Sequence, residues 1–394
     1  MYTQRFGNNY GYGRNKYRNQ RRGRNSFNKG VNPEQYINRI NKSVEEDIYK
    51  PNFTFQEFYI DNTLKENLTW KGYKTPMPIQ DQSIPHILEG KDIIGIANTG
   101  TGKTLAFLIP MLNKVILNRG EKVLIIAPTR ELAVQIEEDL HAICYRLQVN
   151  KVICIGGTNI NSQMYKLRMP HHFVIGTPGR ILDLSKRRAL NFSQFTNIVL
   201  DEVDRMFDMG FVDDIKYVLS QLPEKRQSLF FSATLDNKIE QLIKAHSKDP
   251  VTISVKKRET ADHVDQDVVK VSNGQSKMEV LHDLLNQEDF QKVLIFGRTK
   301  RGVHRLSEEL KDRGFKAESI HGDKTQYQRQ RSLRSFKEGK VNILVATDVA
   351  ARGLDIPNVS HVINFEAPEN YTDYIHRIGR TGRGNNIGKA LTFV

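Results

Sequence analysis

The sequence contains little cysteine and no long hydrophobic run. Cys144 and Cys154 are the only two cysteines among 394 residues, and both lie in apolar surroundings. So few cysteines exclude a disulfide framework and a cysteine-based zinc site, and they fit a reducing compartment. No apolar stretch approaches the ~20 residues that span a bilayer, and the N-terminus lacks the apolar core of a signal peptide. These absences predict a soluble, cytoplasmic protein with no membrane partner.

Acidic residues are missing from the first part of the chain. Residues 1–33 hold no Asp or Glu and mix Arg and Lys with Tyr, Phe, Gly and Asn. Such a segment buries too little apolar surface to fold, so we expect a disordered tail. Its guanidinium groups and aromatic rings can pair with phosphates and stack on bases, which favours RNA contact over a purely solubilising role. The formal net charge of +14 also fits a polyanionic partner.

Beyond the tail, short apolar runs alternate with longer amphipathic stretches. Apolar runs of this kind are typical of parallel strands, and the stretches between them, such as 104–117 and 131–146, are typical of helices. Repeated strand-helix units predict an α/β fold of doubly wound parallel sheets, which bind ligands at the carboxyl ends of their strands. The predicted strands are 93–97, 123–127, 152–155, 173–175, 198–200, 229–231, 293–296, 317–320, 343–346, 362–365 and 390–394.

The length of the chain suits two domains, each with its own core. A charged, polar stretch interrupts the alternation after Pro250 and marks the boundary between them. We therefore expect a tail over 1–45, a first domain over 46–255, a linker over 256–266 and a second domain over 267–394.

A glycine-rich turn follows the first predicted strand. Residues 97–104 are Ala97-Asn98-Thr99-Gly100-Thr101-Gly102-Lys103-Thr104. At a strand-to-helix junction, the backbone N–H groups of such a turn surround nucleotide phosphates. Lys103 would reach the β and γ oxygens, and Thr104 would offer its hydroxyl to Mg²⁺. Although the general pattern has Gly where this chain has Ala97, the motif predicts a nucleoside triphosphate site.

Acidic residues follow another predicted strand of the same domain. Residues 201–204 are Asp-Glu-Val-Asp and come directly after an apolar run. By themselves they could form a solvated loop that caps the next helix. Together with the glycine-rich turn, they suggest that Asp201 ligates Mg²⁺, directly or through its waters, and that Glu202 orients or deprotonates the attacking water.

The second domain has no glycine-rich turn of this type, but it has a dense basic segment. Residues 376–383 contain Arg377, Arg380 and Arg383, interrupted by glycines. A basic surface turn is the simplest interpretation. Beside a nucleotide site on another domain, however, fixed guanidinium groups stabilise the charge that spreads over the γ-phosphate during phosphoryl transfer.

These motifs together resemble those of the DEAD-box RNA helicases of superfamily two. The resemblance extends from about Phe53 to Val394 and implies two RecA-like domains. Val203 departs from the family pattern, which has Ala there, but it adds no polar atom and activity is expected to survive. The matching motifs are Gly72–Gln80, Ala97–Thr104, Pro128–Leu132, Gly156-Gly157, Thr177–Arg180, Asp201–Asp204, Ser232–Thr234, Ile295-Phe296, Gln326 with Arg329, Ala346–Asp348, Arg352–Asp355 and His376–Arg383.

The resemblance implies an adenosine-specific site that uses ATP and Mg²⁺. In this family the amide of Gln80 would read the adenine edge, Phe55 would stack near the base and Asp355 would touch the ribose. Arg380 and Arg383 would be arginine fingers from the other side of the cleft. The expected nucleotide contacts are Phe55, Tyr73, Gln80, Ala97, Thr99, Gly100, Thr101, Gly102, Lys103, Thr104 and Asp355, the catalytic residues are Lys103, Asp201, Glu202, Arg380 and Arg383, and the metal ligands are Thr104 and Asp201.

The same resemblance implies coupling and RNA-binding residues. Ser232 and Thr234 would connect the acidic motif and His376 to domain closure, although their hydroxyls could instead cap a helix. The RNA-binding groups suit phosphate and 2′-OH recognition better than base-edge reading. Two of them, Arg130 and Arg329, could instead be ion-pair partners. The implied RNA contacts are Thr129, Arg130, Gly157, Thr177, Arg180, Gly322, Gln326, Arg329 and Thr347.

The implied activity is ATP-dependent unwinding of short RNA duplexes or remodelling of RNA-protein complexes. ATP and single-stranded RNA would together close the two domains of a monomer, and closure would bring the arginine fingers to the γ-phosphate. Two alternatives remain open from the sequence. An RNA clamp would hydrolyse ATP and hold RNA without unwinding it, and a DNA translocase would respond to DNA as strongly as to RNA.

Overall fold

The computed structural model describes residues 36–38, 49–98, 100–255, 264–272, 274–351, 356, 358–382 and 387–394, with the exception of the Thr372 side chain. Most of the predicted tail and the first eight residues of the predicted linker lie outside these residues. So do three of the predicted site residues, which are Thr99, Asp355 and Arg383.

The first domain is built on a seven-stranded parallel sheet with the order β3-β4-β2-β5-β6-β1-β7. This confirms the predicted α/β architecture. The strand that the sequence did not reveal is β7, an edge strand whose residues are mostly half-buried or exposed. The strands are β1 (Ile93–Ala97), β2 (Val123–Ile126), β3 (Lys151–Cys154), β4 (Phe173–Gly176), β5 (Asn197–Asp201), β6 (Gln227–Ser232) and β7 (Val251–Val255).

Helices cover both faces of this sheet, as a doubly wound fold requires. Residues of α1–α4 pack in one apolar cluster around Phe107, and residues of α5–α9 pack in another around Phe230. The helices are α1 (Asn62–Trp70), α2 (Pro78–Leu88), α3 (Lys103–Leu117), α4 (Arg130–Ile143), α5 (Ile160–Arg168), α6 (Pro178–Lys186), α7 (Val203–Asp208), α8 (Val212–Gln221) and α9 (Asn237–His246), with a 3₁₀ turn at Phe192–Gln194.

Helix α4 ends at Ile143, earlier than the predicted range of 131–146. The backbone beyond it leaves the helical region, because Arg146 and Gln148 have φ values of 61° and 50°. These are left-handed conformations that residues other than glycine seldom adopt. The amphipathic pattern gave no sign of this break.

The second domain has a six-stranded parallel sheet with the order β10-β11-β9-β12-β13-β8. Strand β8 begins at Val264, within the range expected for the linker. The elements are β8 (Val264–Val269), α10 (Lys277–Leu285), β9 (Val293–Phe296), α11 (Lys300–Asp312), β10 (Ala317–Ile320), α12 (Gln326–Lys337), β11 (Ile343–Ala346), α13 (Asp348–Ala351), β12 (His361–Asn364), α14 (Tyr371–Ile378) and β13 (Gly388–Phe393).

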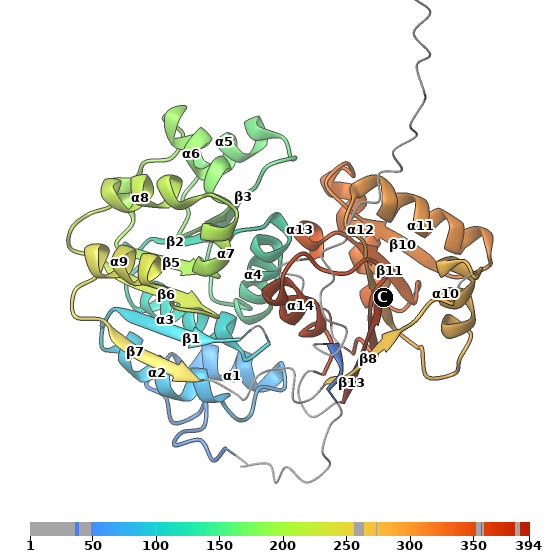
Figure 1. The fold of residues 1–394 in the computed structure, drawn as a ribbon. Helices are drawn as coiled ribbons and strands as arrows, with labels where there is room; N and C mark the ends of the chain where they lie inside the picture. The colour runs from blue at the N-terminus through green and yellow to red at the C-terminus, as the bar shows by residue number, and fades with distance from the viewer. Residues whose placement is uncertain are drawn as a thin grey trace, which may run out of the picture.

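The two domains lie side by side, with α4 of the first and α14 of the second between their sheets (Figure 1). Three residues ahead of the first domain pack on the second. Asn38 forms an antiparallel bridge with Gln266 of β8, and the buried Tyr36 ring lies 4.6 Å from that of Tyr374. Within the described residues, no helix is both long and apolar enough to cross a membrane.

Candidate active site and nucleic-acid interface

The glycine-rich turn joins the carboxyl end of β1 to the first residue of α3, which is Lys103. Gly100 and Gly102 have φ values of 85° and 88°, so the turn requires glycine at both positions. The side chain of Gln80 fastens it to α2. Gln80 Nε2 donates to the carbonyl of Gly102 at 2.9 Å, and Gln80 Oε1 accepts from the N–H of Met77 at 2.9 Å. Within the described residues, the amide thus keeps one N–H for another partner.

A cavity of about 440 Å³ opens above the turn. It is large enough for a small-molecule ligand. Asp201 and Glu202 line it from the carboxyl end of β5. Lys337 of α12 brings a cation from the second domain to the same cavity. The lining residues are Tyr73, Thr75, Met77, Gln80, Gly100, Gly102, Lys103, Thr104, Leu105, Leu132, Gln135, Glu138, Asp139, Asp201, Glu202 and Lys337.

Lys103 and Asp201 are buried in the floor of this cavity with polar atoms left over. Neither Lys103 Nζ nor Asp201 Oδ1 has a hydrogen-bond partner among the described residues. Burial, partly offset by the charge of Lys103, raises the pKa of Asp201 to about 7. Buried polar atoms are normally paired, so these two groups indicate a site made for a charged ligand.

Glu202 is held on the other side of the same cavity in a strained backbone conformation, with a φ of 56°. Its carboxylate accepts a hydrogen bond from the buried guanidinium of Arg205. Burial by itself raises the pKa of Glu202, but Arg205, Lys103 and Arg380 together hold that pKa below its usual value. Glu202 is therefore a carboxylate that can accept a proton. Arg380 belongs to the second domain, so its charge acts on Glu202 across the gap.

The last residue of the acidic motif, Asp204, connects β5 to the end of β6. Asp204 Oδ2 accepts hydrogen bonds from the N–H of Ala233 at 3.2 Å and from the N–H of Thr234 at 3.1 Å. Ser232 Oγ accepts from the N–H of Asp204 at 3.2 Å and donates to the carbonyl of Thr234 at 2.6 Å. Ser232 and Thr234 are thus joined to the acidic motif, and Val203 beside them is fully buried.

The basic segment of the second domain lies on α14 and just beyond it. Arg377 is fully buried and forms two hydrogen bonds with Asp348, at 2.6 and 2.8 Å. This arginine is therefore structural. Arg380 is also buried, while His376 is half-buried, and both line a small hollow with Asp373 between α14 and α13.

A groove of about 390 Å³ brings together most of the predicted RNA contacts. Thr129 caps the start of α4, and the Arg130 side chain lies so close to Gly156 and Gly157 that a Cβ there would press on the guanidinium. Arg180 Nη1 donates to Gln163 Oε1 at 3.0 Å. The lining residues are Pro128, Thr129, Arg130, Glu131, Gly156, Thr177, Gly179, Arg180, Met209, Phe211, Arg329 and Val349.

Glu131 connects this groove to the second domain. Its carboxylate accepts a hydrogen bond from Gln326 Nε2 at 3.2 Å and forms an ion pair with Arg329 Nη2 at 2.9 Å. In this arrangement Gln326 and Arg329 bind the other domain, so the ion-pair interpretation of Arg329 describes its contact here. The sequence gave no reason to select Glu131, although it lies within the Pro128–Leu132 motif.

Some predicted site residues lie outside both hollows. Phe55 is 1% exposed, and its ring packs edge-on against Phe58, 5.9 Å away, in the core behind the nucleotide cavity. Gly322 lies beside Lys300, and Thr347 is buried at the start of α13. Neither of these two lines the groove.

Comparisons with known proteins agree with this geometry. The family model of the DEAD/DEAH box helicase matches residues 77–242, and that of the helicase conserved C-terminal domain matches residues 276–385. The ATP-dependent RNA helicase CshA of Listeria monocytogenes is 46% identical over 86% of this chain and 66% of its own length. The DEAD-box ATP-dependent RNA helicase CshA of Geobacillus kaustophilus is 44% identical over 86% of this chain and 73% of its own length.

The fold agrees as well. The structure of Saccharomyces cerevisiae Dbp5 bound to RNA and ADP BeF3 superposes with a TM-score of 0.77 at 30% identity, covering 86% of this chain and 89% of that one. The chain spans just under two thirds of the length of the CshA helicase of Listeria monocytogenes. With both family models, the motif order and the two-domain fold in agreement, the chain belongs to the DEAD-box family of ATP-dependent RNA helicases.

Proposed function

We propose that this chain is an RNA-stimulated ATPase that closes its two domains on single-stranded RNA and thereby opens short duplexes locally. The observation that carries the proposal is that the second domain completes the nucleotide cavity, because Lys337 of α12 lines it and the charge of Arg380 acts on Glu202. An active site completed by a residue from a second domain works only when the domains are together. The similarity to a structure bound to RNA and a nucleotide supports the closed arrangement as the one that holds RNA.

The residues of the 440 Å³ cavity would divide the work on ATP. Lys103 Nζ, buried and unpaired within the described residues, would bind the phosphates that the turn surrounds. Glu202 would orient the attacking water and accept its proton, and Arg380 would stabilise the charge of the transition state. The spare N–H of Gln80 would select adenine, with Tyr73 beside it in the lining. Asp355 and Arg383 lie outside the described residues, and we retain the proposal that Asp355 contacts the ribose and Arg383 the γ-phosphate.

The residues at the cavity also fit Mg²⁺. This ion takes few protein ligands and usually binds together with substrate phosphates and water. Thr104 Oγ1 and the free Oδ1 of Asp201 would hold it. The described residues contain no group of three or more His, Cys, Asp or Glu that could hold a metal, so the ion would enter with the nucleotide. Bound there, it would neutralise phosphate charge.

RNA would lie in the groove that Thr129, Arg130, Thr177 and Arg180 line. Their hydroxyl and guanidinium groups suit the sugar-phosphate backbone, so binding would be largely independent of sequence. Gly157 would let a phosphate approach the main chain. Gln326 and Arg329 would act mainly by holding the domains together through Glu131.

The test is a strand-displacement assay on a short RNA duplex, run beside an ATPase assay with and without single-stranded RNA. We expect RNA to stimulate hydrolysis and the duplex to open only with ATP. An RNA clamp would hydrolyse ATP and leave the duplex intact, and equal stimulation by DNA would point to a DNA translocase. Hydrolysis at the same rate with and without RNA contradicts the proposal.

A further inference from the structure

An exposed pair of aromatic rings lies on the first domain where the end of α1 meets the end of α4. Trp70 ends α1, and Tyr145 follows the end of α4. Their ring centroids are 6.0 Å apart with 29° between the planes, and the two side chains are 73% and 56% exposed. Lys71 Nζ lies 4.8 Å from the Trp70 ring, and the Arg146 guanidinium lies 5.0 Å from the Tyr145 ring.

The backbone beneath these rings is fixed. The buried Asn67 side chain donates from Nδ2 to the carbonyls of Ile143 at 2.9 Å and Tyr145 at 2.7 Å, which ties α1 to the end of α4. Arg146 has a positive φ, and strain of this kind persists only where the surroundings enforce it. The backbone therefore holds both rings in place on the surface. Because the rings are exposed, packing in the core does not account for their position.

A continuous basic surface extends from the rings along the amino ends of β2, β3 and β4. Arg119 Nη1 donates to the carbonyl of Leu147 at 3.1 Å, directly after Arg146. The N–H of Asn150 donates to His172 Nδ1 at 3.1 Å, which brings residues 170–172 alongside. Lys151 at the start of β3 forms an ion pair with Glu137. The cations on this surface that form no ion pair with a carboxylate in the described part of the chain are Lys71, Arg119, Lys122, Arg146 and Arg168.

Within the described residues, acidic groups on this surface are few, and Glu137 is paired with Lys151. Glu66 lies one turn before Trp70 on α1, and Glu121 accepts hydrogen bonds from Thr196 and Asn197. Two histidines add no charge near neutral pH, because burial lowers the pKa of both His171 and His172. The surface therefore carries an excess of positive charge that the fold itself does not neutralise.

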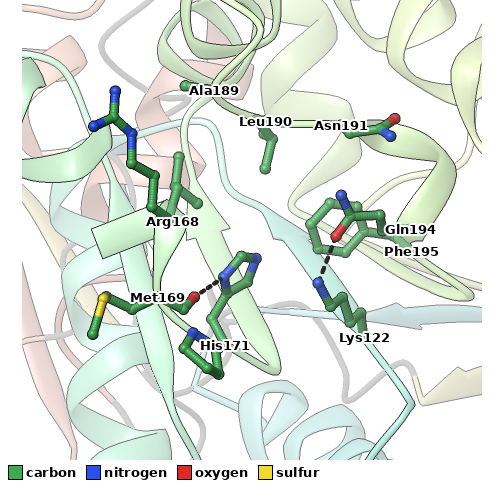
Figure 2. A pocket seen from close by; sticks show the side chains of 11 residues that line it. Lys122, Arg168, Met169, His171, Ala189, Leu190, Asn191, Gln194 and Phe195 are labelled. Atoms are coloured by element: carbon green, nitrogen blue, oxygen red, sulfur yellow. Dashed lines mark hydrogen bonds between the residues drawn. The ribbon is translucent and has the colours of Figure 1, made fainter. Parts of the chain in front are cut away.

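The basic surface ends in a pocket of about 350 Å³ with an apolar floor (Figure 2). Leu190 and the Phe195 ring are buried there, while Lys122 and Arg168 line the pocket with their cationic side chains. Figure 2 shows the Lys122 ammonium donating to Gln194 Oε1, a bond of 2.5 Å, and the His171 ring held by the carbonyl of Met169. Among the described residues, no carboxylate lines this pocket.

We propose that this face of the first domain is a second binding surface for single-stranded RNA, with bases stacked on Trp70 and Tyr145. The proposal rests on the RNA-binding function proposed above. Aromatic rings flanked by unpaired cations are the combination that binds single strands independently of sequence. A base can displace the Lys71 or Arg146 side chain from its ring, and the displaced cation then pairs with a phosphate. The pocket beside Lys122 would receive a further nucleotide.

The two RNA sites would be bridged only by a long strand. The 14 residues of α4 separate Thr129 from Tyr145 and span about 21 Å, which is the length of about six stacked nucleotides. A short RNA would fill the groove between the domains alone. A long RNA would bind both sites, so that the protein stays on the strand when the domains open.

Trp70 is the only tryptophan in the chain, so its fluorescence reports directly on this surface. The full-length protein is titrated with an unpaired RNA of roughly 25 nucleotides, and base stacking is expected to quench the emission. Tyr145→Ala should weaken binding of this RNA at least about fivefold, and Tyr145→Phe should restore it. The double variant Lys122→Glu with Arg168→Glu should bind the long RNA more weakly and with a flatter salt dependence. The control variant Lys216→Glu with Lys238→Glu, at two exposed positions, should change neither the affinity nor its salt dependence.

Stimulation of the ATPase by an RNA of roughly six nucleotides separates this proposal from the proposed function. It should be the same in Tyr145→Ala and in the unaltered chain, because the short RNA needs only the groove. If the long RNA leaves Trp70 emission unchanged at saturation, or binds Tyr145→Ala as tightly as the unaltered chain, the second surface does not bind RNA. Absence of RNA stimulation in the unaltered chain would overturn the proposed function instead.

Discussion

Arg329 of the second domain forms an ion pair with Glu131 of the first, with 2.9 Å between Nη2 and Oε2. The two side chains are 12% and 1% exposed, and Gln326 donates to the same carboxylate. The two partners belong to different domains, so the pair exists only when the domains are in contact, as in the closed arrangement. Removing one partner of a buried pair costs about 3–5 kcal/mol of free energy. Here that loss destabilises the closed arrangement of the two domains.

Glu131→Gln is therefore expected to weaken closure without unfolding either domain. RNA affinity with a non-hydrolysable ATP analogue should fall at least about tenfold, since about 1.4 kcal/mol corresponds to a factor of ten. RNA affinity without nucleotide should change little. Fluorescence anisotropy with labelled RNA measures both. Glu240→Gln, which breaks an exposed ion pair with Lys244 on α9, is the control and should have no such effect.

Glu202→Gln should abolish turnover while the protein still binds ATP and RNA together. The amide keeps the size of the side chain but cannot accept the proton of the attacking water. Single-turnover hydrolysis and RNA binding with ATP provide the two measurements. Glu138→Gln, also at the cavity, should hydrolyse ATP nearly normally. Full activity of Glu202→Gln would remove the assigned role.

Arg380→Ala should lower the RNA-stimulated rate of hydrolysis by about 10³ or more, the range found for arginine fingers. ATP binding to the first domain should be preserved, because Arg380 comes from beyond α14 of the second domain. Steady-state kinetics against RNA concentration, together with ATP binding at equilibrium, separate these effects. An unchanged maximal rate would show that closure does not deliver this charge to the phosphates.

Asp201 should make the stability of the nucleotide-free protein depend on pH. Its pKa is about 7 in the folded chain and about 3.9 when unfolded, so the folded state binds the extra proton between these values. The free energy of unfolding therefore decreases as the pH rises through this window. Asp201→Asn cannot ionise and should exceed the unaltered chain in stability more at about pH 8 than at about pH 5. Urea unfolding at both values tests this, and an equal difference would contradict it.

Local patterns were enough to predict the glycine-rich turn and every strand of the two sheets except β7 and β8. Runs such as Val293–Phe296 are buried on both faces, so their composition alone identifies them. Gly100 and Gly102 occupy positions that only glycine adopts easily, and this restriction is visible in the sequence. The partly exposed edge strand β7 carries no comparable signal.

Contacts between distant residues could not be predicted in the same way. Nothing in the sequence indicates that Glu131 meets Arg329, 198 positions later. Asp81 is a further example, because its buried carboxylate accepts hydrogen bonds from Tyr49 Oη at 2.5 Å and from the N–H of Asn52 at 2.9 Å. Such pairs arise from the packing of whole elements, and a short motif does not record them.

The anchoring of Tyr36 on Tyr374 has a mechanical consequence, because Tyr49 is anchored to Asp81 in the other domain. Only ten residues lie between Asn38 and Tyr49 in the sequence, and a fully extended chain of that length reaches at most about 40 Å. As long as Tyr36 stays seated on the second domain, Asn38 and Tyr49 cannot separate by more than this reach. The anchor therefore sets an upper limit on how far the two domains can part.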